Sequence, residues 1–245
     1  MLDLATAYEE TQRGLVGLVR GLSPEQLGEK VPASPDWSVR DVVAHVTGVA
    51  SDAAHGRIPP DLDLVRALLD SAQAGIRDAL TADQVESRTG RSLEEILTEW
   101  DEVLREVLPM IRGDRPFPRS VPFVDAALVT DLATHSQDIR NALGMPGERE
   151  SAGVSIAFVS YATTLGLRLA QNGVPPLRLE YGGKGRLTGE GAPGATVSAD
   201  RYELYRALAG RRSADQIRAL DWEGDPEPYL DLIPAYGPRM DSVIE

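Results

Sequence analysis

Histidine is rare in this chain of 245 residues, which contains only His45, His55 and His135. One of them, His135, follows Asp131 by four residues in the segment DLATHSQD. Positions i and i+4 share one face of an α-helix, so the Asp131 carboxylate and the His135 imidazole can converge on one ion. Imidazole and carboxylate are ligands that zinc and other divalent metals accept in proteins. The spacing therefore predicts part of a metal site, with His45 from a second helix as the third ligand.

The chemistry of such a site depends on its remaining coordination position. Two histidines and one carboxylate leave a position open to water or substrate, as in catalytic zinc sites. Asp138 lies three residues beyond His135 on the same face, where it could orient a ligand's second nitrogen, hold a water or act as a base. The alternative is structural, because an Asp-x-x-x-His pair also arises by chance on helices and His45 could be an ordinary core histidine.

His55 competes with His45 for the role of third ligand. Ten residues along a helix correspond to an angular offset of roughly 80°, so the two histidines cannot both face the bundle axis well. His55 directly precedes Gly56 and is predicted to be a surface or C-cap residue. Asp41 precedes His45 by four residues, but a capping box with Ser38 explains it.

The elements that must position these residues are predicted to be helices. Apolar residues recur with helical spacing throughout the first ~145 residues. Capping boxes open two of the helices, at Ser38 with Asp41 and at Ser92 with Glu95. The expected helices cover about residues 4–20, 38–55, 62–80, 92–111 and 124–143. Helices of this length joined by short loops predict an up-and-down bundle.

The last ~95 residues have a different pattern. After a helix over about 154–171, residues 177–181 alternate as a strand and Gly182-Gly183 turns the chain. Short strands within 185–197 and helices at about 201–208 and 213–220 follow. This mixture predicts a small α+β domain, and the polar segment after residue 146 divides the chain into domains at 1–147 and 148–245.

Composition limits the possible partners and compartment. Lys+Arg number 25 and Asp+Glu 38, a net charge of −13 that disfavours binding to nucleic acid and anionic lipid. The absence of cysteine removes disulfides, thiolate ligands and a cysteine nucleophile, and it fits a reducing compartment. The N-terminal residues lack a signal-peptide pattern, and no apolar span of ~20 residues is uninterrupted. We expect a cytoplasmic protein whose tryptophans, Trp37, Trp100 and Trp222, have packing roles.

Two motifs together carry a resemblance to a known family. The segment WSVRDVVAH at 37–45, followed by Asp131-x-x-x-His135-x-x-Asp138, resembles the mycothiol-dependent maleylpyruvate isomerase family. That family belongs to the DinB-like superfamily of metal-binding four-helix bundles and carries a C-terminal domain similar to sterol carrier proteins, which residues 204–225 resemble. The resemblance extends over the whole chain. It implies an α+β fold, with a DinB-like bundle at 1–147 and a sterol-carrier-like domain at 148–245.

The resemblance also implies a cofactor and a reaction. Zinc would be held by His45, Asp131 and His135, with Asp138 beside it. The cosubstrate would be a low-molecular-weight thiol, mycothiol, brought from solution because the chain has no cysteine. A Lewis-acid metal lowers the pKa of such a thiol, and the thiolate can isomerise a small electrophile or be transferred to it. The expected assembly is a monomer or homodimer.

Arginines of the C-terminal region are candidates for binding an acidic substrate. The family's second domain contributes an arginine near the site, and Arg211 or Arg212 could be that residue. Alternatively, both satisfy the dipole at the end of a helix. Arg140 points off the metal face by roughly 200°, and a structural ion pair, for instance to the second domain, is expected for it.

The chain departs from the isomerase pattern at Asp131, where the pattern has Glu. Aspartate is shorter by one methylene, or about 1.5 Å of reach, against zinc–oxygen distances of about 2.0–2.2 Å. This departure motivates an alternative function, a non-catalytic metal- or small-molecule-binding module that keeps the fold.

Overall fold

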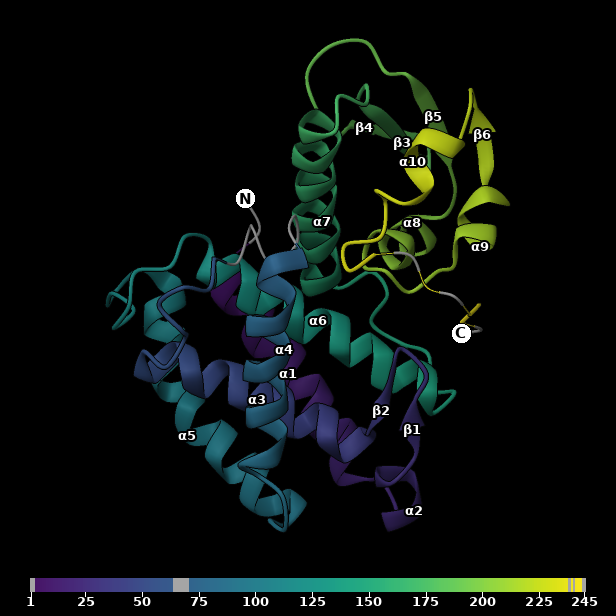
Figure 1. Cartoon of the computed structure of the whole chain (residues 1–245). Helices are drawn as coiled ribbons and strands as arrows, with labels where there is room; N and C mark the ends of the chain where they lie inside the picture. Colours follow the sequence, from purple (N-terminus) through teal and green to yellow (C-terminus); the bar gives the residue numbers. More distant parts are fainter. Residues whose placement is uncertain (1–2, 64–70, 238, 240, 244–245) are drawn as a thin grey trace. The chain divides into compact units, whose positions relative to one another are not determined.

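The computed structural model describes residues 3–63, 71–237, 239 and 241–243 (Figure 1). This part of the chain forms two compact units, one reaching Ile156 and the other beginning at Ala157. The domain limits inferred from the sequence, 1–147 and 148–245, stay a prediction. Helices and small sheets are both present, which confirms the expected α+β class.

The first unit is the predicted helical bundle. Its elements are α1 (Leu4–Arg20), α2 (Pro24–Leu27), β1 (Lys30–Val31), β2 (Ser34–Ser38), α3 (Val39–His55), α4 (Ser71–Glu86), α5 (Leu93–Arg112), α6 (Val124–Ala142) and the first residues of α7 (Ala152–Gln171). Four helices close a ring, because α1 and α3 each pack against both α5 and α6. Helix α4 packs against α3 outside this ring. The ring surrounds the apolar core, to which Trp100 and Tyr8 contribute large, fully buried side chains.

Helix α3 is the most enclosed helix of the ring. Its sequence is apolar or small at most positions, so nearly every face is buried, and it packs against α4, α5, α6 and β2. It begins at the predicted capping box of Ser38 and Asp41 and ends at Gly56, whose φ of 69° is left-handed. Gly48 permits the close approach of α4, because a Cβ at this position would lie 2.6 Å from Cβ of Gln84.

Three features of the first unit differ from the prediction. The third helix was expected at 62–80, but residues 64–70 lie outside the described residues, and the described helix begins at Ser71 and continues to Glu86. It runs past Leu80 because no helix-breaking residue occurs before Gly90. The short helix α2 was not predicted, nor was the antiparallel hairpin of β1 and β2.

The second unit is a small sheet with helices. It contains the remainder of α7, β3 (Leu177–Tyr181), β4 (Lys184–Leu187), β5 (Ala195–Ser198), α8 (Arg201–Leu208), α9 (Ala214–Arg218), β6 (Asp221–Glu223) and α10 (Glu227–Leu230). The strand order is β4-β3-β5-β6, with β3 and β5 parallel and the other pairs antiparallel. The predicted strand 177–181 and its turn at Gly182-Gly183 are confirmed. Strand β6 and helix α10 were not predicted, and α9 is shorter than expected.

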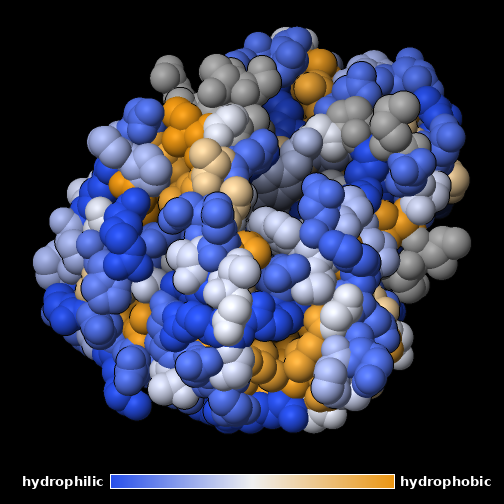
Figure 2. Space-filling view, turned by 60° about the horizontal axis from the view of Figure 1, so that its bottom comes forward, coloured by the Kyte–Doolittle hydropathy of each residue, from blue (hydrophilic) through white to orange (hydrophobic). Residues whose placement is uncertain are grey.

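Two surface properties bear on the expected partners. On the face in Figure 2, hydrophilic residues cover most of the surface and apolar residues form separate patches. Among the described residues, α7 is long and apolar enough to span a membrane by length and composition, although no such segment was expected from the sequence. The protein itself buries 61% of this apolar stretch.

Candidate metal centre

Two adjacent helices bring the three predicted ligands together. His45 lies on α3 and is 2% exposed, while Asp131 and His135 lie one turn apart on α6, which packs directly against α3. Helix α6 begins at Val124 as predicted, and its regular turns from there place Asp131 and His135 on the same face. The helical spacing that motivated the site is therefore confirmed.

The ligand atoms are separated by distances that suit one ion. The Oδ1 atom of Asp131 lies 3.6 Å from Nε2 of His45 and 3.7 Å from Nε2 of His135, and one ligand atom from each residue falls within a 4.8 Å group. These distances are too long for hydrogen bonds. They are close to the separation of about 3.3–3.5 Å between neighbouring ligands of a tetrahedral ion with bonds of about 2.0–2.1 Å. The three residues could hold a divalent metal ion.

Asp131 reaches both histidines despite being shorter than glutamate. The same Oδ1 atom faces both imidazoles, so the missing methylene leaves no gap on either side. Its side chain is 28% exposed, whereas those of His45 and His135 are 3% and 11% exposed. Solvent can therefore reach the ligand group from the side of Asp131.

Asp138 lies behind His135 and away from solvent. Its side chain is fully buried, and Oδ2 lies 3.1 Å from Nδ1 of His135, although the two groups are poorly aligned for a hydrogen bond. A carboxylate at this nitrogen favours a proton on Nδ1 and leaves Nε2 free to bind a metal. Nδ1 of His45 is also buried, but it has no hydrogen-bond partner in the described part of the chain.

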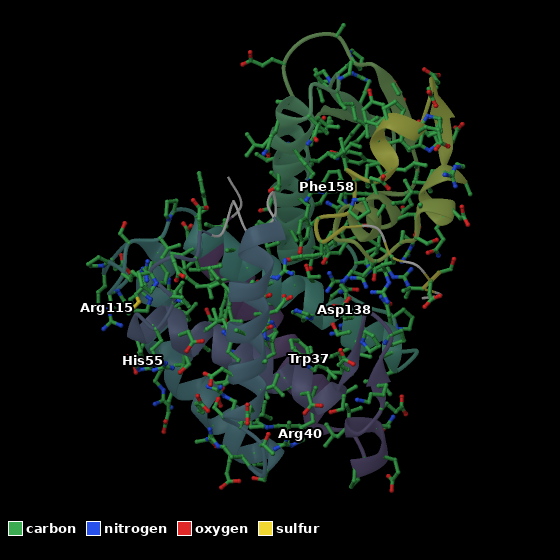
Figure 3. All side chains as sticks on the ribbon, in the orientation of Figure 1. Trp37, Arg40, His55, Arg115, Asp138 and Phe158 are labelled. Atoms are coloured by element: carbon green, nitrogen blue, oxygen red, sulfur yellow. The ribbon has the colours of Figure 1, made fainter. Side chains whose placement is uncertain are left out.

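Trp37 was predicted from the sequence to have a packing role, and the structure also places it beside the candidate ligands. The indole packs against the bundle core and also lies beside both imidazoles, with ring centroids 4.9 Å from His45 and 6.3 Å from His135. Figure 3 shows Trp37 and Asp138 in the same part of the first unit and His55 well away from them. The available sequence signal was the position of Trp37, directly before the capping residue of α3 and eight residues before His45.

Tyr8 of α1 is a further titratable group near the ligands. Burial raises the pKa of its phenol, a hydrogen bond from Nε1 of Trp100 opposes this effect, and the negative charge of Asp131 raises the pKa further. The phenol therefore stays protonated at neutral pH and cannot serve as a base there.

Two residues excluded from the site by the sequence analysis are also outside it in the structure. His55 ends α3 with its side chain 40% exposed, and Nε2 lies 3.7 Å from a carboxylate oxygen of Glu106. Arg140 has a structural ion pair, as expected, at 2.8 Å from Glu148. The partner, Glu148, is the first residue of the predicted second domain (148–245), although it lies in the first compact unit.

The predicted substrate-binding arginines are buried in the second unit, where each is 6% exposed. Arg212 forms an ion pair with both carboxylate oxygens of Glu203. Arg211 donates a hydrogen bond to the carbonyl of Ala209, the C-cap of α8, and its guanidinium lies 5.9 Å from the ring centroid of Tyr236. The contact with Ala209 is the kind that the helix-dipole alternative expects. Substrate binding by these arginines stays a prediction.

Comparisons with known proteins agree with this architecture. The model of the mycothiol maleylpyruvate isomerase N-terminal domain matches residues 8–140. The crystal structure of a histidine-to-alanine mutant of the mycothiol-dependent maleylpyruvate isomerase is similar, with a TM-score of 0.56 and 12% identity over 84% of this chain and 88% of the other. A second crystal structure of that isomerase gives a TM-score of 0.51 and 12% identity, covering 85% and 88% of the two chains.

These comparisons differ in what they establish. No curated protein sequence matches the chain. At 12% identity the solved structures support the fold alone. The family model, in contrast, covers more than half of the chain, including all three predicted ligands and Asp138. The chain therefore belongs to the mycothiol maleylpyruvate isomerase N-terminal domain family.

Proposed function

We propose that this protein is a zinc-dependent enzyme that activates a low-molecular-weight thiol, mycothiol, for isomerisation of a small electrophile or for transfer to it. The observation that carries the proposal is the convergence of Nε2 of His45, Nε2 of His135 and Oδ1 of Asp131 at distances of 3.6 and 3.7 Å around Asp131. Nitrogen and oxygen ligands in this number suit zinc and leave a coordination position open. Family membership supports the choice of thiol.

The chain's own residues have separate tasks in this mechanism. When bound, the metal supplies Lewis-acid chemistry that lowers the pKa of a thiol sulfur. Both histidines present Nε2 from the protein interior, and Asp131 adds negative charge on the solvent side. Because the protein contains no cysteine, the reacting sulfur comes from the cosubstrate. The electrophile then approaches from the exposed side of Asp131.

Asp138 has a positioning role in this proposal. Its carboxylate is buried against Nδ1 of His135 instead of facing solvent, which supports orientation of that imidazole over proton transfer to a substrate. Proton transfer by Asp138 stays a prediction. The two roles separate experimentally, since Asp138→Asn weakens metal binding only if the carboxylate orients His135.

An acidic electrophile such as maleylpyruvate would need a cation, and we retain Arg211 and Arg212 for this role. The expected effect of Arg211→Ala is a higher KM for the acidic electrophile with little change for a neutral one. Equal changes for both electrophiles would indicate that the buried arginine only supports the second unit.

The first experiment is metal analysis by mass spectrometry of protein purified without chelator. We expect about one zinc per chain in the wild type and in His55→Ala, and none in His135→Ala. The metal-loaded protein is then assayed with mycothiol, using maleylpyruvate for isomerisation and monochlorobimane for transfer. Metal binding without thiol-dependent turnover would favour the binding module, and a wild type that refuses added zinc would reject the metal-dependent proposal.

A further inference from the structure

The two candidate histidine ligands differ in the groups that lie near Nδ1, the ring nitrogen that faces away from the site. Nδ1 of His135 makes no hydrogen bond of good geometry, but the Asp138 carboxylate lies 3.1 Å from it. Nδ1 of His45 is buried, and within the described residues it has no hydrogen-bond partner. The terminal torsion of a histidine side chain is broad, so an imidazole without such a partner needs other contacts to keep one orientation. Two described rings pack against the imidazole of His45, that of His135 at 4.9 Å between centroids and that of Trp37, also at 4.9 Å and with an interplanar angle of 39°. Of the two, the Trp37 ring is not itself one of the candidate ligands.

The backbone around Trp37 is held on both sides. Nζ of Lys30 donates a hydrogen bond of 2.8 Å to the carbonyl of Asp36, and the backbone N–H of Ser38 donates one of 2.9 Å to Oδ2 of Asp41. Strand β1, which pairs with β2, inserts the fully buried Val31 into the bundle core. These contacts restrict where the indole can go.

The hairpin also connects the two helices that carry the ligands. Strand β1 packs against α6 and strand β2 packs against α3. Trp37 therefore lies on a segment that contacts both helices, and its ring is near both His45 and His135. The indole is partly exposed, so it also borders the path by which solvent reaches the imidazoles.

We infer that Trp37 is a positioning residue of the metal site, which holds the imidazole of His45 in its ligand orientation in place of a hydrogen bond donated by Nδ1. The inference rests on the proposed metal site. The indole blocks rotation of the His45 ring by contact, whereas Asp138 orients the His135 ring through its charge. Without the indole ring the imidazole of His45 can rotate more freely. Metal binding must then restrict this rotation, which lowers the affinity for the metal.

The experiment uses Co²⁺ as the probe in the full-length chain. Dissociation constants and visible absorption spectra are compared for the wild type, Trp37→Leu and Trp37→Phe, with Trp222→Phe in the second unit as the control. We expect Trp37→Leu to weaken Co²⁺ binding by about 10- to 100-fold, the range for residues that support a ligand, and to alter the absorption bands. Trp37→Phe restores most of the affinity because a ring is again present.

The results test the role of Trp37 separately from the presence of the metal site. Equal Co²⁺ affinities and spectra for wild type and Trp37→Leu would overturn the positioning role and leave the metal site intact. A wild type that binds no Co²⁺ would overturn both. If Trp37→Leu does not fold, fluorescence decides, because Co²⁺ should quench an emission component of the wild type that Trp37→Phe lacks. Quenching that is identical in these two proteins would overturn the inference.

Discussion

His45 and His55 occupy the same helix and each lies near one carboxylate, yet they differ in burial and in the presence of a second imidazole. His45 is 2% exposed and faces His135 and Asp131 of the neighbouring α6. The His55 side chain is 40% exposed and has one nearby carboxylate, Glu106, at 3.7 Å. The comparison shows that a histidine becomes a candidate ligand through the side chains that an adjacent helix brings to it. Residue type alone does not distinguish the two.

The sharpest test of this comparison removes one histidine from each region. We expect His135→Ala to abolish binding of zinc, while His55→Ala keeps about one zinc per chain. The first change leaves two ligands where structural and catalytic zinc sites use at least three from the protein. Isothermal titration of the apo proteins measures both affinities. Comparable zinc loss in His55→Ala would mean that the different surroundings of the two histidines do not decide metal binding.

The next largest effect is expected at Asp138, whose carboxylate lies beside Nδ1 of the candidate ligand His135. Asp138→Asn replaces the carboxylate near Nδ1 of His135 by a neutral amide, and we expect zinc affinity to fall by about 10- to 100-fold. The fold is retained because the two side chains have nearly the same volume. Competition with a coloured chelator measures the dissociation constant, and unchanged affinity would remove Asp138 from the site.

Between the two histidines, α3 is packed tightly against α4 at Gly48. We expect Gly48→Ala to destabilise the protein by about 1–3 kcal/mol, because the new Cβ would lie 2.6 Å from Cβ of Gln84. The matched control is Gly17→Ala in α1, where the new Cβ meets no atom of the described residues within 4 Å and should stabilise the helix by about 0.5–1 kcal/mol. Urea denaturation of the apo proteins measures both, and equal effects would contradict the close approach of α4.

The smallest expected effect compares two glutamates of α5. Burial raises the pKa of Glu99, but hydrogen bonds and charges of Arg88 and Arg91 outweigh it and hold the pKa below its ordinary value. A lowered pKa stabilises the folded state at neutral pH, and this contribution disappears as the pH falls through the folded pKa. We expect Glu99→Gln to cost about 1 kcal/mol at pH 7 and nothing in acid.

Glu106 provides the control for this pH dependence, since it lies beside His55 with its side chain 45% exposed. Glu106→Gln should change stability at pH 7 by less than about 0.5 kcal/mol. Urea midpoints between pH 3 and pH 7 measure the two profiles. If both substitutions had the same profile, the Arg88–Glu99–Arg91 cluster would contribute no more than an exposed pair.

Local sequence rules predicted the parts of the site that depend on a single helix. The capping boxes of Ser38 and Ser92 and the four-residue spacing of Asp131 and His135 are properties of neighbouring residues, and the structure contains all of them. The position of His45 opposite α6 depends on helix packing, so the sequence could only suggest it. The family resemblance supplied that pairing.

The hairpin that carries Trp37 could not be predicted by the same rules. Strand β1 has two residues, and β2 contains a proline and an aspartate, which are both uncommon in strands. These strands form because Val31 and Trp37 pack against the bundle, a contact that no local pattern encodes. The end of α4 was predicted too early, at Leu80 instead of Glu86. No glycine or proline shortly after Leu80 supported that earlier end.

The candidate ligands are far apart in the chain, since 135 − 45 = 90 positions separate the two histidines. During synthesis, a ribosome makes His45 long before α6 exists, so an ion cannot be held by both helices until most of the first unit has been made and has folded. An ion that binds only the folded chain stabilises it by mass action, by about 2.7 kcal/mol at a free concentration 100 times the dissociation constant. Metal supply in the cell would then set how much of this protein survives proteolysis, independently of any turnover.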